Sequence, residues 1–445
     1  MLQRYARKDS PITRIWPANE EYKFKMWLLV ELTVLQARSE LDEIPVSLSK
    51  KQIDRFVSEI VIDPKEINRI EKDVTKHDVL AFLMHVSPQL PKRLRPWLHQ
   101  KMTSYDPGDT GLSLMLVQSI DELVVGVKRV MSVLKQRAYE FKYDPMIGRT
   151  HGIHAEPITC GVKFANWYDE MKRHLDRLFR LRQNMAVGKI SGAVGMYTLP
   201  PKIEQIVCYK LGLNPIITTQ IISRDLISEY CATIAIIAGS IGKFCTTLRG
   251  LTRTEIREVM EFFDREQRGS SAMPHKKNPI GLENLVGVCR DIGSRFMTAF
   301  QNQITWDERD ITNSAPERLI LPEISVYLDY VLHRFADTFQ KMMVFPKQMR
   351  KNLRLMKGLI YSQDVQSLVA AKSGLPREDT YGIVRKVVLR CWDSNFKLSF
   401  FNELKADECI MQYVSEAELK KCFSLNEKLK YTDYIFEQVF KEKVQ

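Results

Sequence analysis

The chain has 445 residues, of which 44% are hydrophobic and 27% are charged, and its formal net charge is +12. The length favours two or three domains over one compact core, and the composition is that of a soluble globular protein. The first eleven residues contain no apolar run, which argues against a secretory signal. The longest apolar run, 231–241, is too short to cross a bilayer and predicts a buried helix.

The positive charge suits anionic partners, either nucleic acids or small molecules that carry phosphates and carboxylates. A generally basic protein without such a partner is an equal alternative. The eight cysteines contain no C-x-x-C pair, and most of them lie in helix-like sequence. We therefore expect reduced, mostly buried cysteines in a cytoplasmic protein.

Apolar residues at three- and four-residue spacing predict a strongly helical chain, and strand-like alternation is almost absent. The long predicted helices, several of which open with proline, span 21–41, 110–141, 157–183, 223–263, 279–303 and 316–345. They exceed the usual helix length roughly two- to threefold, so they must bury their apolar faces against one another in an elongated bundle. The stretch 234–238 is apolar on more than one face, which indicates an oligomer with a shared helical core.

Breaks in the pattern predict three domains. An N-terminal helical domain covers 1–105, a central long-helix bundle covers 106–357, and a C-terminal helical domain with shorter elements covers 358–445.

The segment 269–279, GSSAMPHKKNP, has an unusual density of polar groups. Asn278 is a good N-cap and Pro279 a good first helical residue, so the positive end of the next helix is expected to face this loop. Together with Lys276 and Lys277 it would hold an anion, and it could stabilise an alkoxide of Ser270 or Ser271. The alternative is a capped surface loop.

A second polar cluster is GRTHGIHAEP at 148–157, which offers Thr150, His151 and His154 before a proline that predicts a helix start. Histidine is the usual proton donor at neutral pH. The H-x-x-H spacing leaves a metal site or a structural role open.

Further polar clusters are TKHDV at 75–79, KMTSYDPGDT at 101–110 and WDERDITNSAPER at 306–318. The arginines of the last cluster suit a carboxylate or a phosphate, although each cluster alone is more typical of a surface ion pair or a cap. The glycine-rich GKISGAVG at 188–195 fits neither the dinucleotide fingerprint nor the P-loop. We expect a turn-rich loop close to a ligand or to a neighbouring helix.

The segment 269–279 resembles the signature G-S-S-x-M-P-x-K-x-N-P of the fumarase/aspartase superfamily. Other motifs narrow the resemblance to the adenylosuccinate lyase family. They are RY at 4–5, KHD at 76–78, TS at 103–104, GRTHGIHAEP, GKISGAVG, TTQ at 218–220, ERDI at 308–311 and GLIYSQ at 358–363. The likeness covers nearly the whole chain in the expected order.

The resemblance implies an all-α, three-domain subunit whose central helices join in a homotetramer, with active sites shared between subunits. It implies two β-eliminations of fumarate in purine biosynthesis. Adenylosuccinate would give AMP, and succinylaminoimidazole carboxamide ribotide would give aminoimidazole carboxamide ribotide. The partners would be these nucleotides, with no nucleic acid, membrane, metal or organic cofactor.

The resemblance also assigns roles to individual residues. Ser270 is the expected general base and His151 the general acid, which Glu283 orients. Lys276 is expected to stabilise the carbanion. The expected substrate-binding residues are Arg4, Tyr5, Lys76, His77, Asp78, Thr103, Ser104, Thr150, Gln220, Ser271, Lys277, Asn278, Arg309, Ser314 and Arg318.

Three positions depart from the family pattern, with Tyr105, Asp307 and Pro316 in place of commoner residues. They affect the expected substrate geometry and leave the expected reaction class intact. The alternatives are another superfamily lyase such as argininosuccinate lyase or aspartase, and a non-catalytic helical structural protein. A basic nucleic-acid-binding protein is a further alternative, but no aromatic and basic stripe supports it.

Overall fold

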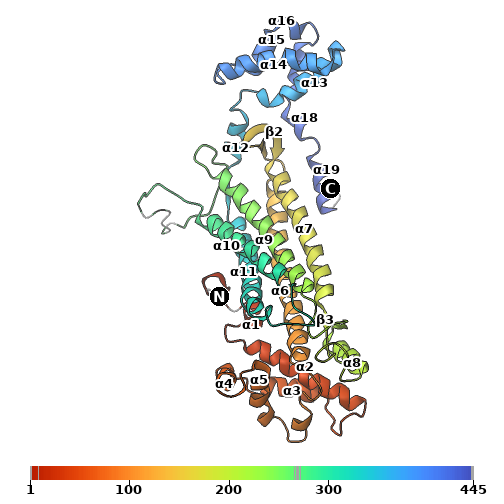
Figure 1. Cartoon of the computed structure of the whole chain (residues 1–445). Helices are drawn as coiled ribbons and strands as arrows, with labels where there is room; N and C mark the ends of the chain where they lie inside the picture. Colours follow the sequence, from red (N-terminus) through yellow and green to blue (C-terminus); the bar gives the residue numbers. More distant parts are fainter. Residues whose placement is uncertain (1–2, 9, 265, 267–269, 271, 442–445) are drawn as a thin grey trace. The chain divides into compact units, whose positions relative to one another are not determined.

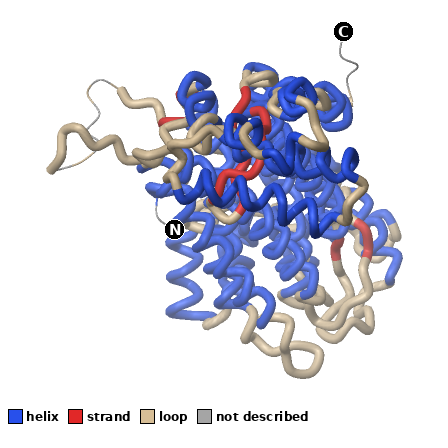
Figure 2. Tube along the Cα trace, turned by 90° about the horizontal axis from the view of Figure 1, so that it is seen from above, coloured by secondary structure: helices blue, strands red, loops and turns tan. Residues whose placement is uncertain are grey.

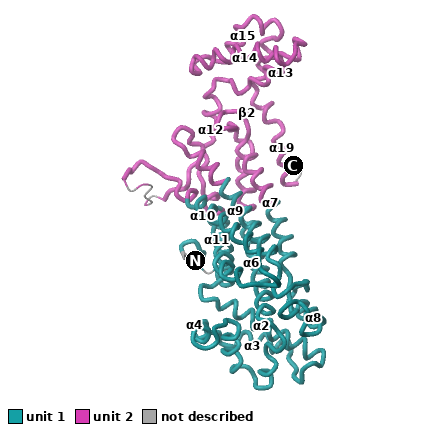
Figure 3. The backbone as a smooth tube through the Cα atoms, in the orientation of Figure 1, with its two compact units in different colours: residues 1–130, 173–243, 284–335 teal, residues 131–172, 244–283, 336–445 magenta. Residues whose placement is uncertain are grey.

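The computed structural model describes residues 3–8, 10–264, 266, 270 and 272–441. Helices dominate this part of the chain, and the strands are short (Figures 1 and 2). The chain divides into two compact units (Figure 3). Unit 1 comprises 1–130, 173–243 and 284–335, and unit 2 comprises 131–172, 244–283 and 336–445. This division does not test the expected three domains, which remain a prediction.

The α-helices of the N-terminal and central parts are α1 (Pro11–Ile15), α2 (Glu21–Glu40), α3 (Lys50–Glu59), α4 (Pro64–Ile70), α5 (Asp78–Val86), α6 (Tyr105–Glu140), α7 (Cys160–Met185), α8 (Pro201–Leu211), α9 (Asp225–Leu251), α10 (Ile280–Gln301) and α11 (Ser314–Gln340). The later ones are α12 (Pro346–Leu353), α13 (Ser362–Ser373), α14 (Arg377–Asp393), α15 (Phe400–Lys405), α16 (Glu408–Met411), α17 (Glu416–Cys422), α18 (Leu425–Leu429) and α19 (Thr432–Phe440).

Short 3-10 turns occur at η1 (Gln3–Tyr5), η3 (Ser87–Gln89), η4 (Arg95–Trp97) and η5 (Leu359–Tyr361), and η2 (Glu71–Thr75) is a π-helix. The strands are β1 (Pro145–Thr150), β2 (Ile153–Thr159), β3 (Val187–Gly188), β4 (Asn214–Pro215), β5 (Val259–Met260) and β6 (Met343–Val344). They form three two-stranded sheets, β1–β2 and β5–β6 antiparallel and β3–β4 parallel.

The predicted long segments are helical, but some of the predicted helix ends were wrong. Pro157 does not start a helix, because it lies in β2 and pairs with Ile147 of β1. The predicted helix over 223–263 ends at Leu251, and Val259 and Met260 then pair with β6. A proline is tolerated in β2 because a two-stranded sheet consists of edge strands only.

In unit 1, an aromatic core fixes the helices that carry the KHD motif. Phe24 of α2 stacks on Phe82 of α5 with ring centroids 5.9 Å apart, and Trp27 meets Phe82 edge-on at 5.6 Å. The π-helix η2 ends at Lys76, which adopts a left-handed conformation (φ 54°), and His77 is extended before α5 begins. The core thus holds α5, and the turn presents Lys76, His77 and Asp78 at its N-terminus.

The GKISGAVG loop is tied to the start of α6 by a fully buried ion pair. The Lys189 ammonium lies 2.5 Å from the Asp106 carboxylate, and both side chains have no exposed surface. The backbone N–H of Gly192 donates to the same oxygen of Asp106, and that of Thr103 donates to the other oxygen. The expectation that this loop lies against a helix is therefore confirmed. The hydrogen bond from the Thr103 N–H to Asp106 also holds the TS motif at the start of α6.

In unit 2, buried aromatic rings join the long helices. Trp167 of α7 stacks on Phe244 of α9 at 4.7 Å, and Phe164 meets Phe339 of α11 edge-on at 4.8 Å. The start of α7 packs so closely on the end of α6 that a Cβ at Gly161 would lie 2.4 Å from the Ala138 carbonyl oxygen. Glycine is required there by close packing.

The shorter helices from α13 to α17 bury a separate apolar cluster, also in unit 2. Its members include Val365, Val369, Val387, Phe400 and Leu419. Six of the eight cysteines are buried, which confirms the expectation for most of them, while Cys409 is exposed and Cys422 is half-buried.

Two helices in the described part of the chain, α6 and α9, are long and apolar enough to cross a membrane by length and composition. The apolar segment of α9 is therefore longer than the run at 231–241 suggested. Core helices of soluble proteins meet the same criterion, and most of the apolar window of α6 is buried here. Half of the window of α9 is exposed in the single chain.

Candidate active site

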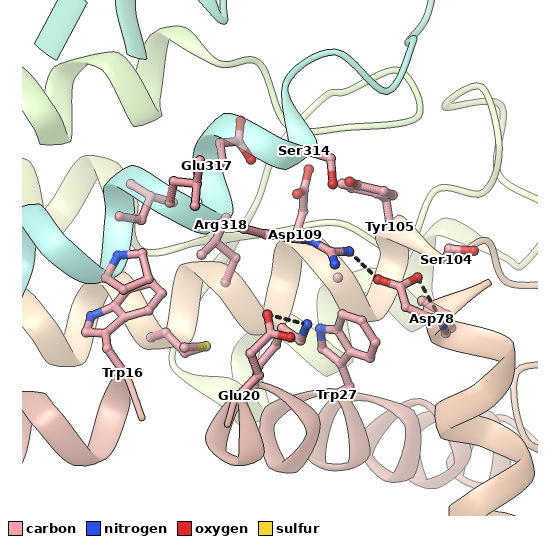
Figure 4. A pocket seen from close by; sticks show the side chains of 18 of the residues that line it. Trp16, Glu20, Trp27, Asp78, Ser104, Tyr105, Asp109, Ser314, Glu317 and Arg318 are labelled. Atoms are coloured by element: carbon pink, nitrogen blue, oxygen red, sulfur yellow. Dashed lines mark hydrogen bonds and ion pairs between the residues drawn. The ribbon is translucent and has the colours of Figure 1, made fainter. Parts of the chain in front are cut away.

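A cavity of about 600 Å³ in unit 1 is lined by residues from α2, η2, α5, α6 and α11. Figure 4 shows side chains from these elements converging on it. Seven of the predicted binding residues lie in its wall. They are Lys76, His77, Asp78, Ser104, Arg309, Ser314 and Arg318. Segments more than 200 residues apart in the sequence therefore form one pocket.

Charged groups of the pocket pair with one another. The Arg318 guanidinium lies 2.5 Å from the Asp78 carboxylate (Figure 4). Burial disfavours the charge of Arg318, but Asp78 and Glu20 act together against this effect, and the pKa of Arg318 is raised. Nδ1 of His77 lies 3.5 Å from the Asp78 carboxylate, and Nε2 lies 3.2 Å from the Ser104 hydroxyl. An incoming anion could compete with Asp78 for the Arg318 guanidinium.

Arg309 stacks on Tyr105, one of the positions that depart from the family pattern. The guanidinium carbon lies 3.8 Å from the centre of the Tyr105 ring, and Nη1 donates to Gln220 at 3.4 Å. Nε and Nη2 of Arg309 are buried without a hydrogen-bond partner in the described part of the chain. Burial raises the pKa of Tyr105, whose hydroxyl forms a hydrogen bond with the Ser314 side chain. The aromatic ring is thus a platform that fixes the arginine.

The other four predicted binding residues of unit 1 lie outside the wall of this cavity. Arg4 is exposed in η1, and Tyr5 meets Tyr330 edge-on at 5.7 Å. Thr103 uses its backbone N–H to bind Asp106 at the start of α6. Gln220, the fourth, reaches the pocket only through Arg309.

The pocket also contains charged residues that no motif pointed to. Lys23 and Glu20 line it from the α2 side, and their side chains form an ion pair of 2.8 Å. Arg224 lines it as well, but this buried guanidinium is held by Asp109 at 2.7 Å and by Glu317 at 2.9 Å. Glu20 is the N-cap of α2, and Lys23 and Trp27 lie one helical turn apart. An i, i+3 pair of opposite charge is common on surface helices, so no specific signal in the sequence pointed to this part of the pocket.

The signature segment lies in unit 2. The Ser270 hydroxyl oxygen accepts hydrogen bonds from the backbone N–H groups of Ala272 at 3.3 Å and Met273 at 3.2 Å. Two donors directed at one oxygen favour its anionic form. Lys276 and Lys277 are exposed, and Asn278 is half-buried. The predicted site residue Ser271 lies outside the described residues, as does Gly269.

The N-terminus of α10 follows this segment, and an internal carboxylate already occupies it. Glu261 accepts from the backbone N–H of Gly281 at 3.1 Å and from that of Leu282 at 2.6 Å. The expected anion at this helix end is therefore a side chain of the protein in this structure. Glu283, in the first turn, pairs with Arg249 at 3.5 Å.

Thr150 and His151 lie at the tip of the β1–β2 hairpin, also in unit 2. His151 is exposed with φ 53°, a left-handed conformation, and Gly152 follows with φ 80°. Close to the tip, Arg149 of β1 anchors the hairpin, because its guanidinium donates to both oxygens of the buried Glu258 at 2.8 and 3.0 Å. This anchor holds the end of β1 while the side chain of His151 stays exposed at the tip. The orientation of His151 by Glu283 remains a prediction.

His154, three residues further on, differs from His151. It is half-buried, and its Nδ1 atom is buried without a partner among the described residues. Burial, with help from Arg149, lowers the pKa of His154. Among the described residues, no group of three or more His, Cys, Asp or Glu could hold a metal ion.

Comparison with known proteins identifies the class first. The model of a family described as "Lyase" matches residues 3–293. The fold resembles that of a fumarate lyase from Mesorhizobium sp. BNC1, with a TM-score of 0.86 and 21% identity over 98% of each chain. It also resembles a 3-carboxy-cis,cis-muconate lactonizing enzyme from Pseudomonas putida, with a TM-score of 0.82 and 23% identity over 97% of this chain and 96% of the other. The fold and the signature segment define a lyase of the fumarase/aspartase superfamily.

Closer relatives define the particular family. The model of the adenylosuccinate lyase C-terminus matches residues 358–439. Adenylosuccinate lyase from Bacillus subtilis (strain 168) is 43% identical over 441 residues, and that from Aquifex aeolicus (strain VF5) is 41% identical over 444 residues, each covering 99% of both chains. The chain belongs to the adenylosuccinate lyase family.

Proposed function

We propose that this chain splits adenylosuccinate into AMP and fumarate without a cofactor. The observation that carries the proposal is the 43% identity to the Bacillus subtilis adenylosuccinate lyase over 99% of both chains. By the same reasoning it also releases fumarate from succinylaminoimidazole carboxamide ribotide, which bears the same succinylamino group on a smaller ring. Both reactions belong to purine biosynthesis, and we place the protein in the cytoplasm.

The nucleotide end of the substrate is assigned to the cavity in unit 1. A phosphate monoester is a dianion near neutral pH, and the Arg318 and Ser314 side chains with His77 supply donors for it. Arg309, held on the Tyr105 ring, supplies a further planar donor. In this assignment Asp78 holds Arg318 until the phosphate arrives.

The chemistry takes place on the succinyl arm. Removal of a proton beside a carboxylate gives a carbanion whose charge spreads into that carboxylate, and such a carbon is a weak acid in water. Ser270 accepts this proton as the general base. Its alkoxide is stabilised by the N–H groups of Ala272 and Met273, which already point at Oγ. Lys276 stabilises the substrate carboxylate that receives the charge, so the substrate itself provides the electron sink.

The C–N bond then breaks, and the departing nitrogen requires a proton. His151 donates it as the general acid. Its exposed position at the hairpin tip suits contact with a substrate held by another copy of the chain. We therefore propose a homotetramer in which the nucleotide pocket, Ser270 and His151 of one site come from different subunits. The half-exposed apolar window of α9 supports this assembly, since it needs a neighbour.

Purified protein should convert adenylosuccinate to AMP, and the reaction is followed by ultraviolet absorbance. Argininosuccinate is the control substrate, because it carries the same succinyl arm on a guanidino nitrogen instead of a purine nucleotide. We expect turnover of adenylosuccinate and none of argininosuccinate. The reverse result would assign the chain to another lyase of the superfamily, and turnover of neither would support the non-catalytic alternative.

A further inference from the structure

Lys23 on α2 lines the cavity of unit 1, and its ammonium is a cation that lies outside all of the family motifs. Its side chain is 18% exposed, and its ammonium lies 2.8 Å from the Glu20 carboxylate. The same nitrogen lies 4.7 Å from the centre of the Phe24 ring and 5.0 Å from that of Trp27. Figure 4 shows Glu20 and Trp27 on the α2 side of the pocket. Aromatic faces and one carboxylate therefore surround this ammonium.

This environment is costly for an ammonium. Burial lowers the pKa of Lys23, and the Glu20 carboxylate opposes that change only in part. Arg318 and Asp78 act on the same ammonium electrostatically. A second anion in the cavity would therefore stabilise Lys23 and Arg318 together.

We propose that Lys23 is a further substrate-binding residue, which leaves Glu20 and binds the phosphate of the nucleotide beside Arg318. This inference rests on the proposed function for the identity of the substrate. Lys23 and Arg318 are paired in the same way, each with one carboxylate of the pocket. Lys23 pairs with Glu20, and Arg318 pairs with Asp78. A phosphate dianion offers three acceptor oxygens and more charge than either carboxylate, so it can engage both cations.

Two other cations on the cavity wall, Arg224 and Arg309, are less suited to this exchange. Arg224 is buried between Asp109 and Glu317, and its removal from two carboxylates would leave buried charges unpaired. Arg309 is fixed on the Tyr105 ring. Among the described residues Lys23 forms an ion pair with Glu20 alone, and its side chain has four rotatable bonds, so its ammonium can turn from Glu20 into the cavity.

The chain provides a matched control on the same helix. Lys25 pairs with Glu21 at 2.7 Å, but Lys25 does not line the cavity. We expect Lys23→Met to raise the KM for adenylosuccinate by about 10- to 100-fold with kcat changed less than about threefold, because one charge-assisted hydrogen bond to the bound substrate is lost. Lys25→Met should change KM less than about twofold. Lys23→Arg should recover most of the affinity.

Glu20→Gln separates a binding role from a structural one. If Lys23 serves the phosphate, removal of the competing carboxylate should leave KM unchanged or lower it. If the ion pair only holds α2, Glu20→Gln should raise KM as much as Lys23→Met does, and the proposal would be wrong. Circular dichroism and the thermal unfolding midpoint establish that each variant is folded.

A binding measurement keeps this test independent of turnover. Calorimetry should show that the wild-type protein binds AMP more tightly than adenosine, and that Lys23→Met removes about tenfold or more of this preference while binding adenosine as before. Equal preference in the variant and the wild type, or no preference for AMP in the wild type, would overturn the role of Lys23. Inactivity of the wild type towards adenylosuccinate would instead contradict the proposed function alone.

Discussion

Replacement of Ser270 by alanine should lower kcat for adenylosuccinate by about a thousandfold or more. The hydroxyl is the group we assign to proton removal, and its oxygen already accepts from two backbone N–H groups at 3.3 and 3.2 Å. These donors stabilise an alkoxide but cannot themselves accept a proton. An alanine leaves the two donors in place and removes the base.

The measurement is steady-state kinetics with the variant and a matched serine control. Ser367 on α13 is exposed, and its hydroxyl donates to the carbonyl of Gln363 in its own helix. Ser367→Ala should therefore retain wild-type kcat and KM. Loss of activity in both variants would indicate a general effect on folding, and near-normal turnover by Ser270→Ala would show that another group removes the proton.

Replacement of His151 by glutamine should lower kcat by about 10²- to 10⁴-fold, the range measured for the loss of a general acid. Glutamine preserves hydrogen bonding at the tip of the β1–β2 hairpin but cannot donate a proton to the departing nitrogen. The hairpin should keep its structure, because the β1–β2 pairing and the Arg149–Glu258 ion pair do not involve the side chain of residue 151.

His275 is the matched histidine control, since it is exposed in the signature segment at a position that the signature leaves open. His275→Gln should change kcat less than about threefold. A substrate whose leaving group needs no proton should also restore much of the rate of His151→Gln. If His151→Gln turned over adenylosuccinate at the wild-type rate, the proton would come from elsewhere.

The sequence predicted the long helices well, because their apolar periodicity directly reflects burial in a bundle. It failed where pairing depends on distant residues. Pro157 resembled a helix start, but the segment before it pairs with β1 as an edge strand. The end of α9 was extended to residue 263, although Val259 pairs with Val344, 85 positions away. The helical periodicity of a segment does not indicate which distant residues will pair with it.

Dependence on distant residues also explains which residues of the site could be proposed from the sequence and which could not. The signature and KHD motifs are contiguous, so the sequence alone was enough to propose Ser270, His77 and Asp78 as site residues. Glu20 and Lys23 at i and i+3 have the pattern of an ordinary surface ion pair. Only the tertiary structure shows that this pair lines a cavity whose wall includes Arg318, almost 300 residues further on. Likewise, no local pattern indicates that Glu261 caps α10.

The most direct test of the account is to mix the two inactive variants, Ser270→Ala and His151→Gln, under conditions that dissociate and reassemble the oligomer. If each site takes these residues from different subunits, random reassembly of equal amounts should give about one quarter of the sites both intact groups, and about one quarter of wild-type activity should return. Activity that stays at the average of the two separate variants after proven exchange of subunits would contradict the shared site.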